Sequence, residues 1–235
     1  MSGHLILLRH GQSVWNAENR FTGWVDVGLT ATGNDEARRA GQILADSGIL
    51  VDAVHTSLLT RAIMTTDIAL EQAGRLWLTP ERTWRLNERH YGALAGLDKN
   101  ATIERYGIDQ VHLWRRSYLE RPPALEDITE FRNDPRYRNL SDAELPCGES
   151  LADVQARLLP YWTDRIAPQL ATGMNVLIGA HGNSLRALVK HIEEIDDRAV
   201  ADLEIATGTP RHYEVTGDTV GRLTFSGARP LVNNA

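Results

Sequence analysis

Short apolar runs along the chain alternate with stretches whose apolar residues recur at helical spacing. The first run, Leu-Ile-Leu-Leu at residues 5–8, is short and continuous, which is typical of a strand buried on both faces. The same patterns predict further strands at 51–56, 76–79 and 174–180, and late edge strands at 211–215 and 223–225. The predicted helices cover 32–48, 58–72, 150–170 with a bend at Pro160, and 183–192.

The alternation of strands with helices predicts the fold class. This order favours a three-layer α/β fold, with a mostly parallel central sheet and helices on both faces. Between about residues 84 and 147 the pattern breaks down into a segment rich in Arg, Tyr and Pro, with short helices predicted at 100–106 and 109–116. A long insertion in an α/β domain often covers a functional site. We therefore expect a single domain over residues 1–235, with a lid-like insertion at about 84–147.

Composition and charge argue against nucleic-acid-binding, secreted and membrane-spanning proteins. A net charge of −6 argues against a general nucleic-acid binder, although a local cluster of arginines can still bind a small anion. The N-terminus lacks the features of a signal peptide, and no apolar run is long enough to span a bilayer. The single cysteine, Cys147, allows no intrachain disulfide and fits a reducing compartment. We expect a cytoplasmic protein that binds neither nucleic acid nor membranes.

Two histidines follow predicted buried strands in the same local context. His10 comes directly after the run at 5–8, and His181 comes directly after the strand at 174–180, and each is followed by a glycine. Because ligands of open parallel sheets bind outside the carboxyl ends of the strands, both imidazoles are expected at one edge of the sheet. The helix predicted from residue 183 would also aim free backbone N–H groups at an anion.

The other histidines fit a structural role better. A lone histidine at a strand end is more often a hydrogen-bonded structural residue, and this interpretation applies to His4, His55, His112, His191 and His212. A metal site is the alternative for a pair of histidines. The sequence contains no His-Glu-x-x-His element and no compact cluster of carboxylates and histidines, so no metal is predicted.

Two arginines, one beside His10 and one after another predicted strand, indicate phosphoryl chemistry. Arg9 adjoins His10, and Arg61 lies just after the predicted strand at 51–56. A neutral imidazole is a competent nucleophile towards phosphorus, and arginines stabilise the charge on the transferring group. Each charge-assisted hydrogen bond to phosphate contributes about 1.5–3 kcal/mol.

Longer motifs carry a resemblance to a known family. The segments concerned are residues 8–24, which contain Arg-His-Gly-Gln-Ser and continue to Phe-Thr-Gly-Trp, 86–92 (Leu-Asn-Glu-Arg-His-Tyr-Gly), 114–116 (Trp-Arg-Arg) and 180–187. The first resembles the signature of the histidine phosphatase superfamily. Together, in this order, the segments resemble the cofactor-dependent phosphoglycerate mutases of that superfamily. The similarity extends over nearly the whole chain, to about Glu214.

The resemblance implies roles for individual residues. His10 would be the nucleophile that becomes phosphorylated, and Glu88 would be the general acid–base acting on the substrate hydroxyl. The residues that would hold the transferring phosphoryl group are Arg9, Asn16, Arg61 and His181. The residues that would bind the rest of the substrate are Thr22, Gly23, Arg89, Tyr91, Lys99, Arg115, Arg116, Gly182 and Asn183.

The resemblance also implies a reaction. Members of this family are isomerases that interconvert 3-phosphoglycerate and 2-phosphoglycerate in glycolysis and gluconeogenesis. They use a phosphohistidine that is primed by 2,3-bisphosphoglycerate, and they use no metal. They are commonly homodimers or homotetramers.

Some features depart from the family pattern, and other functions stay open. Gln12 stands where many members have glutamate, from which we expect tuning of the reaction and not its loss. The tail after Phe225 lacks lysine, which leaves its part in turnover open. The alternatives are a phosphatase or a bisphosphoglycerate synthase on the same scaffold, and a non-catalytic module that binds a phosphorylated ligand.

Overall fold

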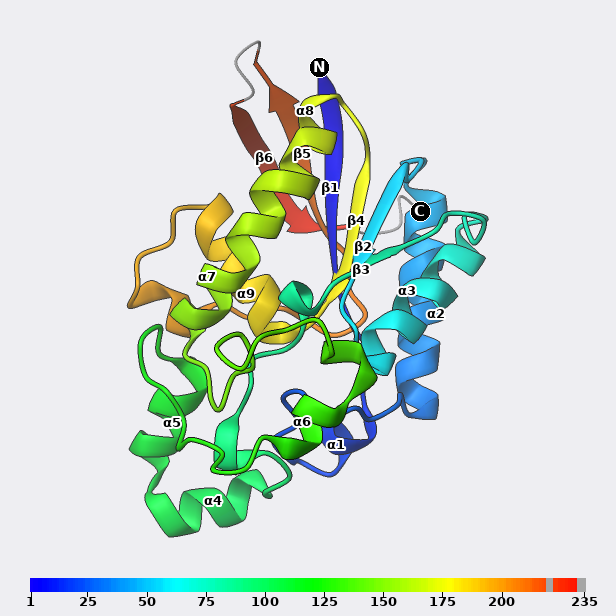
Figure 1. Cartoon of the computed structure of the whole chain (residues 1–235). Coiled ribbons are helices and arrows are strands. Elements are labelled where there is room, and N and C mark those ends of the chain that lie inside the picture. Colours follow the sequence, from blue (N-terminus) through cyan, green and yellow to red (C-terminus); the bar gives the residue numbers. More distant parts are fainter. Residues whose placement is uncertain (219–221, 232–235) are drawn as a thin grey trace.

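A six-stranded sheet forms the centre of the computed structural model, which describes residues 1–218 and 222–231 (Figure 1). Its strands are β1 (Ser2–Arg9), β2 (Ala53–Thr56), β3 (Glu81–Arg82), β4 (Val176–Ala180), β5 (Arg211–Gly217) and β6 (Leu223–Pro230). They lie in the order β3-β2-β4-β1-β5-β6. The pairs β1–β4, β2–β4 and β2–β3 are parallel, whereas β1–β5 and β5–β6 are antiparallel.

The two central strands explain the apolar runs in the sequence. Residues Leu5 to Leu8 of β1 and all of β4 are buried, because helices cover both faces of the sheet there. One face packs against α2 (Ala31–Asp46) and α3 (Thr60–Gln72). The other packs against α7 (Leu151–Tyr161), α8 (Ala167–Ala171) and α9 (Gly182–Ile192). The predicted α/β class with helices on both faces is confirmed (Figure 1).

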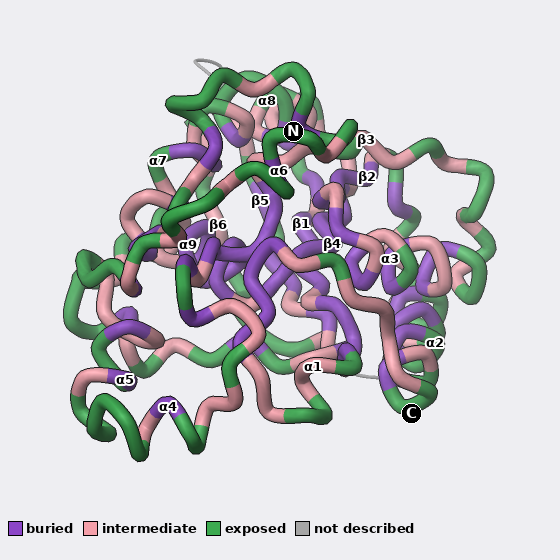
Figure 2. Tube along the Cα trace, turned by 60° about the horizontal axis from the view of Figure 1, so that its bottom comes forward, coloured by how far each residue is buried: buried purple, intermediate pink, exposed green. Residues whose placement is uncertain are grey.

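The insertion lies beyond the carboxyl ends of the parallel strands. It contains α4 (Lys99–Tyr106), α5 (Ile108–Arg116) and α6 (Thr129–Asn133), and Asp98, just before α4, pairs with Arg20, which follows the one-turn helix α1 (Val14–Ala17). Short 3₁₀ turns connect the elements at Trp84–Leu86, Gly92–Leu94, Pro135–Tyr137 and Ala199–Asp202. Figure 2 shows that the buried trace is concentrated in the sheet, whereas α4 and α5 are mainly exposed or half-buried. The two short helices that the sequence predicts in the insertion are confirmed.

Two of the predicted strands need correction. Residues 76–79 form no strand, because Leu76 and Trp77 point into solvent and the chain turns there; the paired strand β3 comes slightly later. The strand at 211–215 is not an edge strand, because β5 lies between β1 and β6, and only β6 is at that edge. Both errors come from long-range pairing, which local sequence does not specify.

The helix predicted at 150–170 contains an irregular turn beside its proline. Pro160 lies inside α7, and a π-helical turn, Trp162–Ile166, follows directly and leads into α8. Proline removes one backbone hydrogen bond from a helix, and π-turns are common where the ladder is interrupted. Of the segment after Phe225, residues 226–230 belong to β6, and residues 232–235 lie outside the described residues.

Candidate active site

The carboxyl ends of β1 and β4 bring the two histidines together. Arg9 pairs with Ala180 across the parallel strands, and the backbone N–H of His10 donates to the Ala180 carbonyl at 3.0 Å. The imidazoles of His10 and His181 then face each other, with ring centroids 5.0 Å apart and an angle of 61° between the ring planes. The predicted meeting of these rings at one edge of the sheet is confirmed.

The turn after β1 fixes the orientation of His10. A Cβ atom on Gly11 would lie 2.2 Å from the Gly33 carbonyl oxygen, so only glycine lets this turn pack against the start of α2. The His10 Nδ1 atom lies 2.7 Å from the Gly11 carbonyl oxygen and therefore donates to it, which leaves Nε2 with the lone pair. Burial, together with the nearby Arg61 and Arg9, holds the pKa of His10 well below its usual value. The imidazole is therefore neutral at pH 7.

His181 is also neutral and has one free ring nitrogen. Its Nε2 lies 2.7 Å from the Ser57 hydroxyl oxygen, and that oxygen accepts the backbone N–H of Leu59. The hydroxyl can therefore donate to Nε2, which places the ring proton on Nδ1, a buried atom that has no hydrogen-bond partner among the described residues. Burial and then Arg61 and His10 hold the pKa of His181 well below its usual value.

Two arginines flank the imidazoles. Arg61, on the first turn of α3, is 1% exposed, and it donates to the carbonyls of Gly23 at 2.7 Å and Val25 at 3.0 Å. Burial lowers its pKa to about 10, so it stays charged near neutral pH. Arg9 donates to the Ile205 carbonyl at 2.7 Å. In both guanidinium groups the Nε atom is buried and has no partner in the part of the chain that the structure describes, which leaves donors available for an anion.

Glu88 is the carboxylate beside this cluster. It is 8% exposed, and its Oε1 accepts the backbone N–H groups of Arg89 at 2.7 Å and Asn183 at 3.1 Å. Its own carbonyl oxygen accepts the Trp24 indole N–H at 2.7 Å and an Arg157 N–H at 3.0 Å. The side chain and the backbone of Glu88 are therefore both held in place.

A second group of cations lies on the insertion side of the pocket. It consists of Lys99 at the start of α4 and of Arg115 and Arg116 at the end of α5. Burial, with a smaller contribution from Arg115, lowers the pKa of Lys99. Tyr91 lies beside this group and accepts from the Asn183 amide at 3.2 Å. Burial raises the pKa of the Tyr91 phenol, but the charge and hydrogen bond of Arg89 together with the hydrogen bond from Asn183 outweigh it, so that the pKa lies below its usual value.

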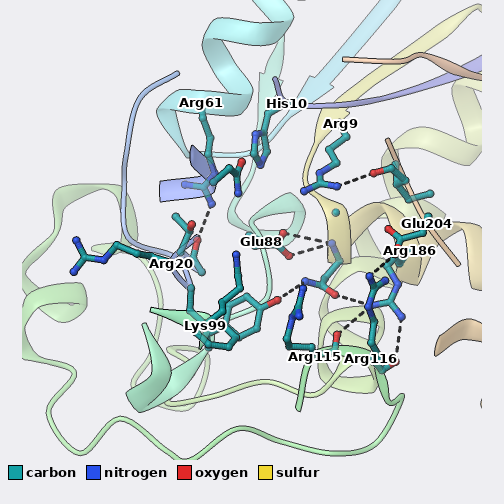
Figure 3. Close-up of a pocket in the computed structure, with 18 residues that line it drawn as sticks. Arg9, His10, Arg20, Arg61, Glu88, Lys99, Arg115, Arg116, Arg186 and Glu204 are labelled. Atoms are coloured by element: carbon teal, nitrogen blue, oxygen red, sulfur yellow. Dashed lines mark hydrogen bonds and ion pairs between the residues drawn. The ribbon is translucent and has the colours of Figure 1, made fainter. Parts of the chain in front are cut away.

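The two groups of cations line one pocket (Figure 3). The sequence-predicted residues on its wall are Arg9, His10, Asn16, Thr22, Gly23, Arg61, Glu88, Tyr91, Lys99, Arg115, Arg116, Gly182 and Asn183. His181 is not on this wall, but its ring centroid lies 5.0 Å from that of His10, which is. Arg89 does not line the pocket: its guanidinium stacks 4.7 Å from the centre of the Tyr91 ring and donates to the Arg115 carbonyl at 3.1 Å. Arg89 thus supports the wall, and direct contact with substrate stays a prediction.

The pocket suits a small, highly charged anion. The unpartnered donors include Arg9 Nε, Arg61 Nε and His181 Nδ1, and Thr22 Oγ1 is also buried without a partner. Orphaned buried donors are rare in folded proteins, and those of Arg9, Arg61 and Thr22 belong to the wall of one pocket. Within residues 1–218 and 222–231, no group of three His, Cys, Asp or Glu side chains is placed to hold a metal ion. The same ranges contain no helix that is long and apolar enough to cross a membrane.

Comparison with known proteins assigns the chain to a family. The profile of the histidine phosphatase superfamily (branch 1) matches residues 5–136 and 133–224. A 2,3-bisphosphoglycerate-dependent phosphoglycerate mutase of Thermobifida fusca is 57% identical over 222 residues, which are 94% of this chain and 90% of that protein. The enzyme of the same name from Lactobacillus acidophilus is 54% identical over 211 residues, 89% of this chain and 92% of that one. The chain belongs to this mutase family.

Two solved structures with much lower sequence identity share the fold of this chain. A protein titled mycobacterial hydrolase 1 superimposes with a TM-score of 0.73 at 23% identity and covers 100% of this chain and 99% of its own. A phosphoglycerate mutase from Bacillus anthracis has a TM-score of 0.68 at 20% identity, over 97% of this chain and 92% of its own. These likenesses agree with the α/β architecture described above.

Sequence reasoning missed several residues on the wall of this mutase-family pocket. They are Arg20, Phe21, Arg186, Glu204 and Ile205. The first three lie inside the quoted motifs, and Arg186 follows Asn183 by one helical turn, so the spacing carried a signal. Nothing local marks Glu204 and Ile205, which reach the pocket only because the chain returns from α9 past the end of α5.

Proposed function

We propose that the protein interconverts 3-phosphoglycerate and 2-phosphoglycerate through a phosphohistidine on His10, primed by 2,3-bisphosphoglycerate, as a step of glycolysis and gluconeogenesis. The observation that carries this proposal is the arrangement of two cationic groups in one pocket. One surrounds the paired imidazoles of His10 and His181, and the other lies on the insertion side. A phosphoglycerate carries a phosphate and a carboxylate, and the two groups of cations match these two charges.

His10 is the nucleophile in this proposal. Its Nε2 lone pair attacks phosphorus, and the Nδ1–H bond to the Gly11 carbonyl stabilises the charge that develops on the ring. The depressed pKa keeps the imidazole unprotonated before attack. The phosphoryl group is then held by the free Nε donors of Arg9 and Arg61 and by Nδ1 of His181. Asn16 adds a further donor from the pocket wall.

Glu88 is the general acid–base. Its Oε1 is engaged by two backbone N–H groups, whereas among the described residues its Oε2 makes a single, long contact, 3.4 Å from the Asn183 nitrogen. A substrate hydroxyl beside Oε2 can give up its proton as the hydroxyl attacks the phosphohistidine and take one back in the reverse step. The position of Glu88 on the wall, next to Arg9 and Gly182, supports this role.

The remaining wall residues bind the part of the substrate that does not react. We assign this role to Thr22, Gly23, Tyr91, Lys99, Arg115, Arg116, Gly182 and Asn183. Arginine and lysine at this end suit a carboxylate or a second phosphate. The same residues fit 2,3-bisphosphoglycerate, which supplies the phosphoryl group that loads His10. The orphaned donors at the opposite end fit its other phosphate.

The function is tested by following 3-phosphoglycerate with ³¹P NMR in the presence of EDTA. We expect conversion to 2-phosphoglycerate that is strongly stimulated by catalytic amounts of 2,3-bisphosphoglycerate. Release of inorganic phosphate without isomerisation would select a phosphatase on the same scaffold. Net accumulation of 2,3-bisphosphoglycerate when a phosphoryl donor is present would select the synthase, and binding without turnover would select a ligand-binding module.

We also propose that the chain is a single cytoplasmic domain that assembles into a homodimer or homotetramer. One central sheet links the first and last strands, β1 and β5–β6, which supports a single domain. The edge strand β3 follows the exposed apolar residues Leu76 and Trp77, which supports self-association. Light scattering should give the mass of two or four chains, and a monomer would contradict the proposed assembly. Thermal unfolding should show one transition, and two transitions would contradict the single domain.

A further inference from the structure

Three pocket arginines hold the segment that follows α9. Arg186 donates to the Val200 carbonyl at 2.7 Å, and Arg9 donates to the Ile205 carbonyl at 2.7 Å. Between these two anchors, the Glu204 carboxylate forms an ion pair with Arg116. Because both flanking carbonyls are tied to pocket arginines, the backbone fixes Glu204 on the wall of the pocket (Figure 3).

Glu204 differs from the other carboxylate on the pocket wall. Glu88 accepts backbone N–H groups and faces the imidazole end, whereas Glu204 accepts from a cation that is assigned to the substrate. The side chain of Glu204 is 67% exposed, and that of Arg116 is 24% exposed. An ion pair this close to water stabilises little, so another anion can replace the carboxylate. A phosphate or a substrate carboxylate would then take its place on Arg116.

We propose that Glu204 is a specificity-determining residue, an internal counter-ion of Arg116 that an anionic group of the incoming phosphoglycerate must displace. This inference rests on the proposed function for the identity of the ligand. A ligand that carries charge at one end only gains nothing from Arg116 unless it displaces Glu204, and it lacks the second charge to do so. The pair therefore lowers the affinity for an anionic group at this end of the pocket but keeps neutral polar groups off Arg116, because only an anion can replace the Glu204 carboxylate.

The backbone around Arg116 makes the displacement local. Arg186 donates to the Arg116 carbonyl at 3.1 Å, and Arg89 donates to the Arg115 carbonyl at 3.1 Å. The end of α5 is thus held by its carbonyls and not by the pair with Glu204. Loss of the Glu204 charge should therefore free the guanidinium for the ligand without moving the helix.

The test compares Glu204→Gln with Asp202→Asn by titration calorimetry of 3-phosphoglycerate. Asp202 is an exposed acid on the same segment that does not line the pocket, so its variant removes the same charge at a similar place. We expect Glu204→Gln to bind 3-phosphoglycerate about two- to fivefold more tightly, the range of an exposed ion pair, and Asp202→Asn to bind like the wild type. Unchanged or weaker binding by Glu204→Gln would overturn the proposal, because Glu204 would then not compete with the ligand.

A second comparison separates the pair from general charge effects. In an Arg116→Gln background, the Glu204→Gln change should have no further effect on affinity, because its partner is gone. An equal gain in that background would overturn the proposal by showing that Glu204 acts through the overall field. Binding does not depend on turnover, so a wild type that binds 3-phosphoglycerate without isomerising it would contradict the proposed function alone. A wild type that isomerises normally, with Glu204→Gln showing no gain in affinity, would contradict this inference alone.

Discussion

The two ends of the pocket are built in different ways. At the reacting end, His10, Arg61 and His181 come directly from strand ends or the first helical turn after a strand, and all are almost fully buried. At the other end, Lys99, Arg115 and Arg116 come from short helices of the insertion, and their side chains are half-buried. The sheet therefore holds the reacting side chains in buried, fixed positions, whereas the charged side chains of the insertion are more exposed to solvent. We expect changes at the first end to affect kcat most and changes at the second to affect KM.

Removal of the nucleophile should have the largest effect. His10→Ala is expected to lower the rate of isomerisation about 10⁴-fold or more, because the variant lacks the nucleophile and the Nε2 atom of the neighbouring His181 is engaged by the Ser57 hydroxyl. The assay is ³¹P NMR of 3-phosphoglycerate with added 2,3-bisphosphoglycerate. His112→Ala, which changes an exposed histidine of α5, is the control and should stay near wild-type activity. A His10→Ala variant that keeps more than a tenth of the activity would rule His10 out as nucleophile.

The next largest effect should come from the acid–base residue. Glu88→Gln keeps the size of the side chain and an oxygen that can accept the backbone N–H groups, but it cannot exchange the substrate proton. We expect kcat to fall by about 10²–10⁴-fold with a smaller change in KM. Glu104→Gln, on the exposed face of α4, serves as the matched control. A loss of less than tenfold would remove Glu88 from this role.

A cation of the insertion end should affect binding more than chemistry. Arg115→Gln removes charge-assisted hydrogen bonds worth about 1.5–3 kcal/mol, which corresponds to a KM for 3-phosphoglycerate about 10- to 150-fold higher. The value of kcat should change much less, and Arg105→Gln, an exposed arginine of α4, should change neither. If kcat fell as strongly as KM rose, the division of labour between the two ends would be wrong.

The smallest effect is on stability in acid. Burial holds the pKa values of His10 and His181 below their usual value of 6.5, so the unfolded chain binds protons that the folded chain does not. The free energy of unfolding should therefore be insensitive to these groups above about pH 6.5 and fall as the pH decreases below it. The slope is at most about 1.4 kcal/mol per pH unit for each histidine. Urea unfolding at pH 7.5, 6.5 and 5.5 measures it, and a slope that His10→Asn does not reduce would contradict the assignment to His10.

The reacting end could be predicted from the sequence because local signals and a general topological rule sufficed. Residues 5–8 had to form a buried strand, and parallel strands present their carboxyl ends at one edge. Local sequence patterns gave wrong predictions where the pairing of distant strands determines the structure. The apolar pattern at 76–79 is typical of a strand, but Leu76 and Trp77 are exposed at a turn. The sequence of β5 does not indicate that this strand lies between two others in the sheet.

The same reasoning explains which site residues could not be foreseen. Arg186 contacts the carbonyls of Arg115 and Arg116 only because α9 packs near the end of α5. Glu204 lies on the pocket wall because the segment after α9 passes the end of α5, and no sequence motif predicts this path. The orientation of Arg89 towards the Arg115 carbonyl also depends on this packing. Motifs therefore indicated the residues of the site better than the contacts that position them.

The central claim is that His10 carries the phosphoryl group, and mass spectrometry of the protein after brief incubation with 2,3-bisphosphoglycerate tests it most directly. We expect one added phosphate that is stable in base and labile in acid, located on the peptide that contains His10 and absent from His10→Ala. A phosphate on any other residue, or an unmodified protein that nevertheless isomerises 3-phosphoglycerate, would contradict the account.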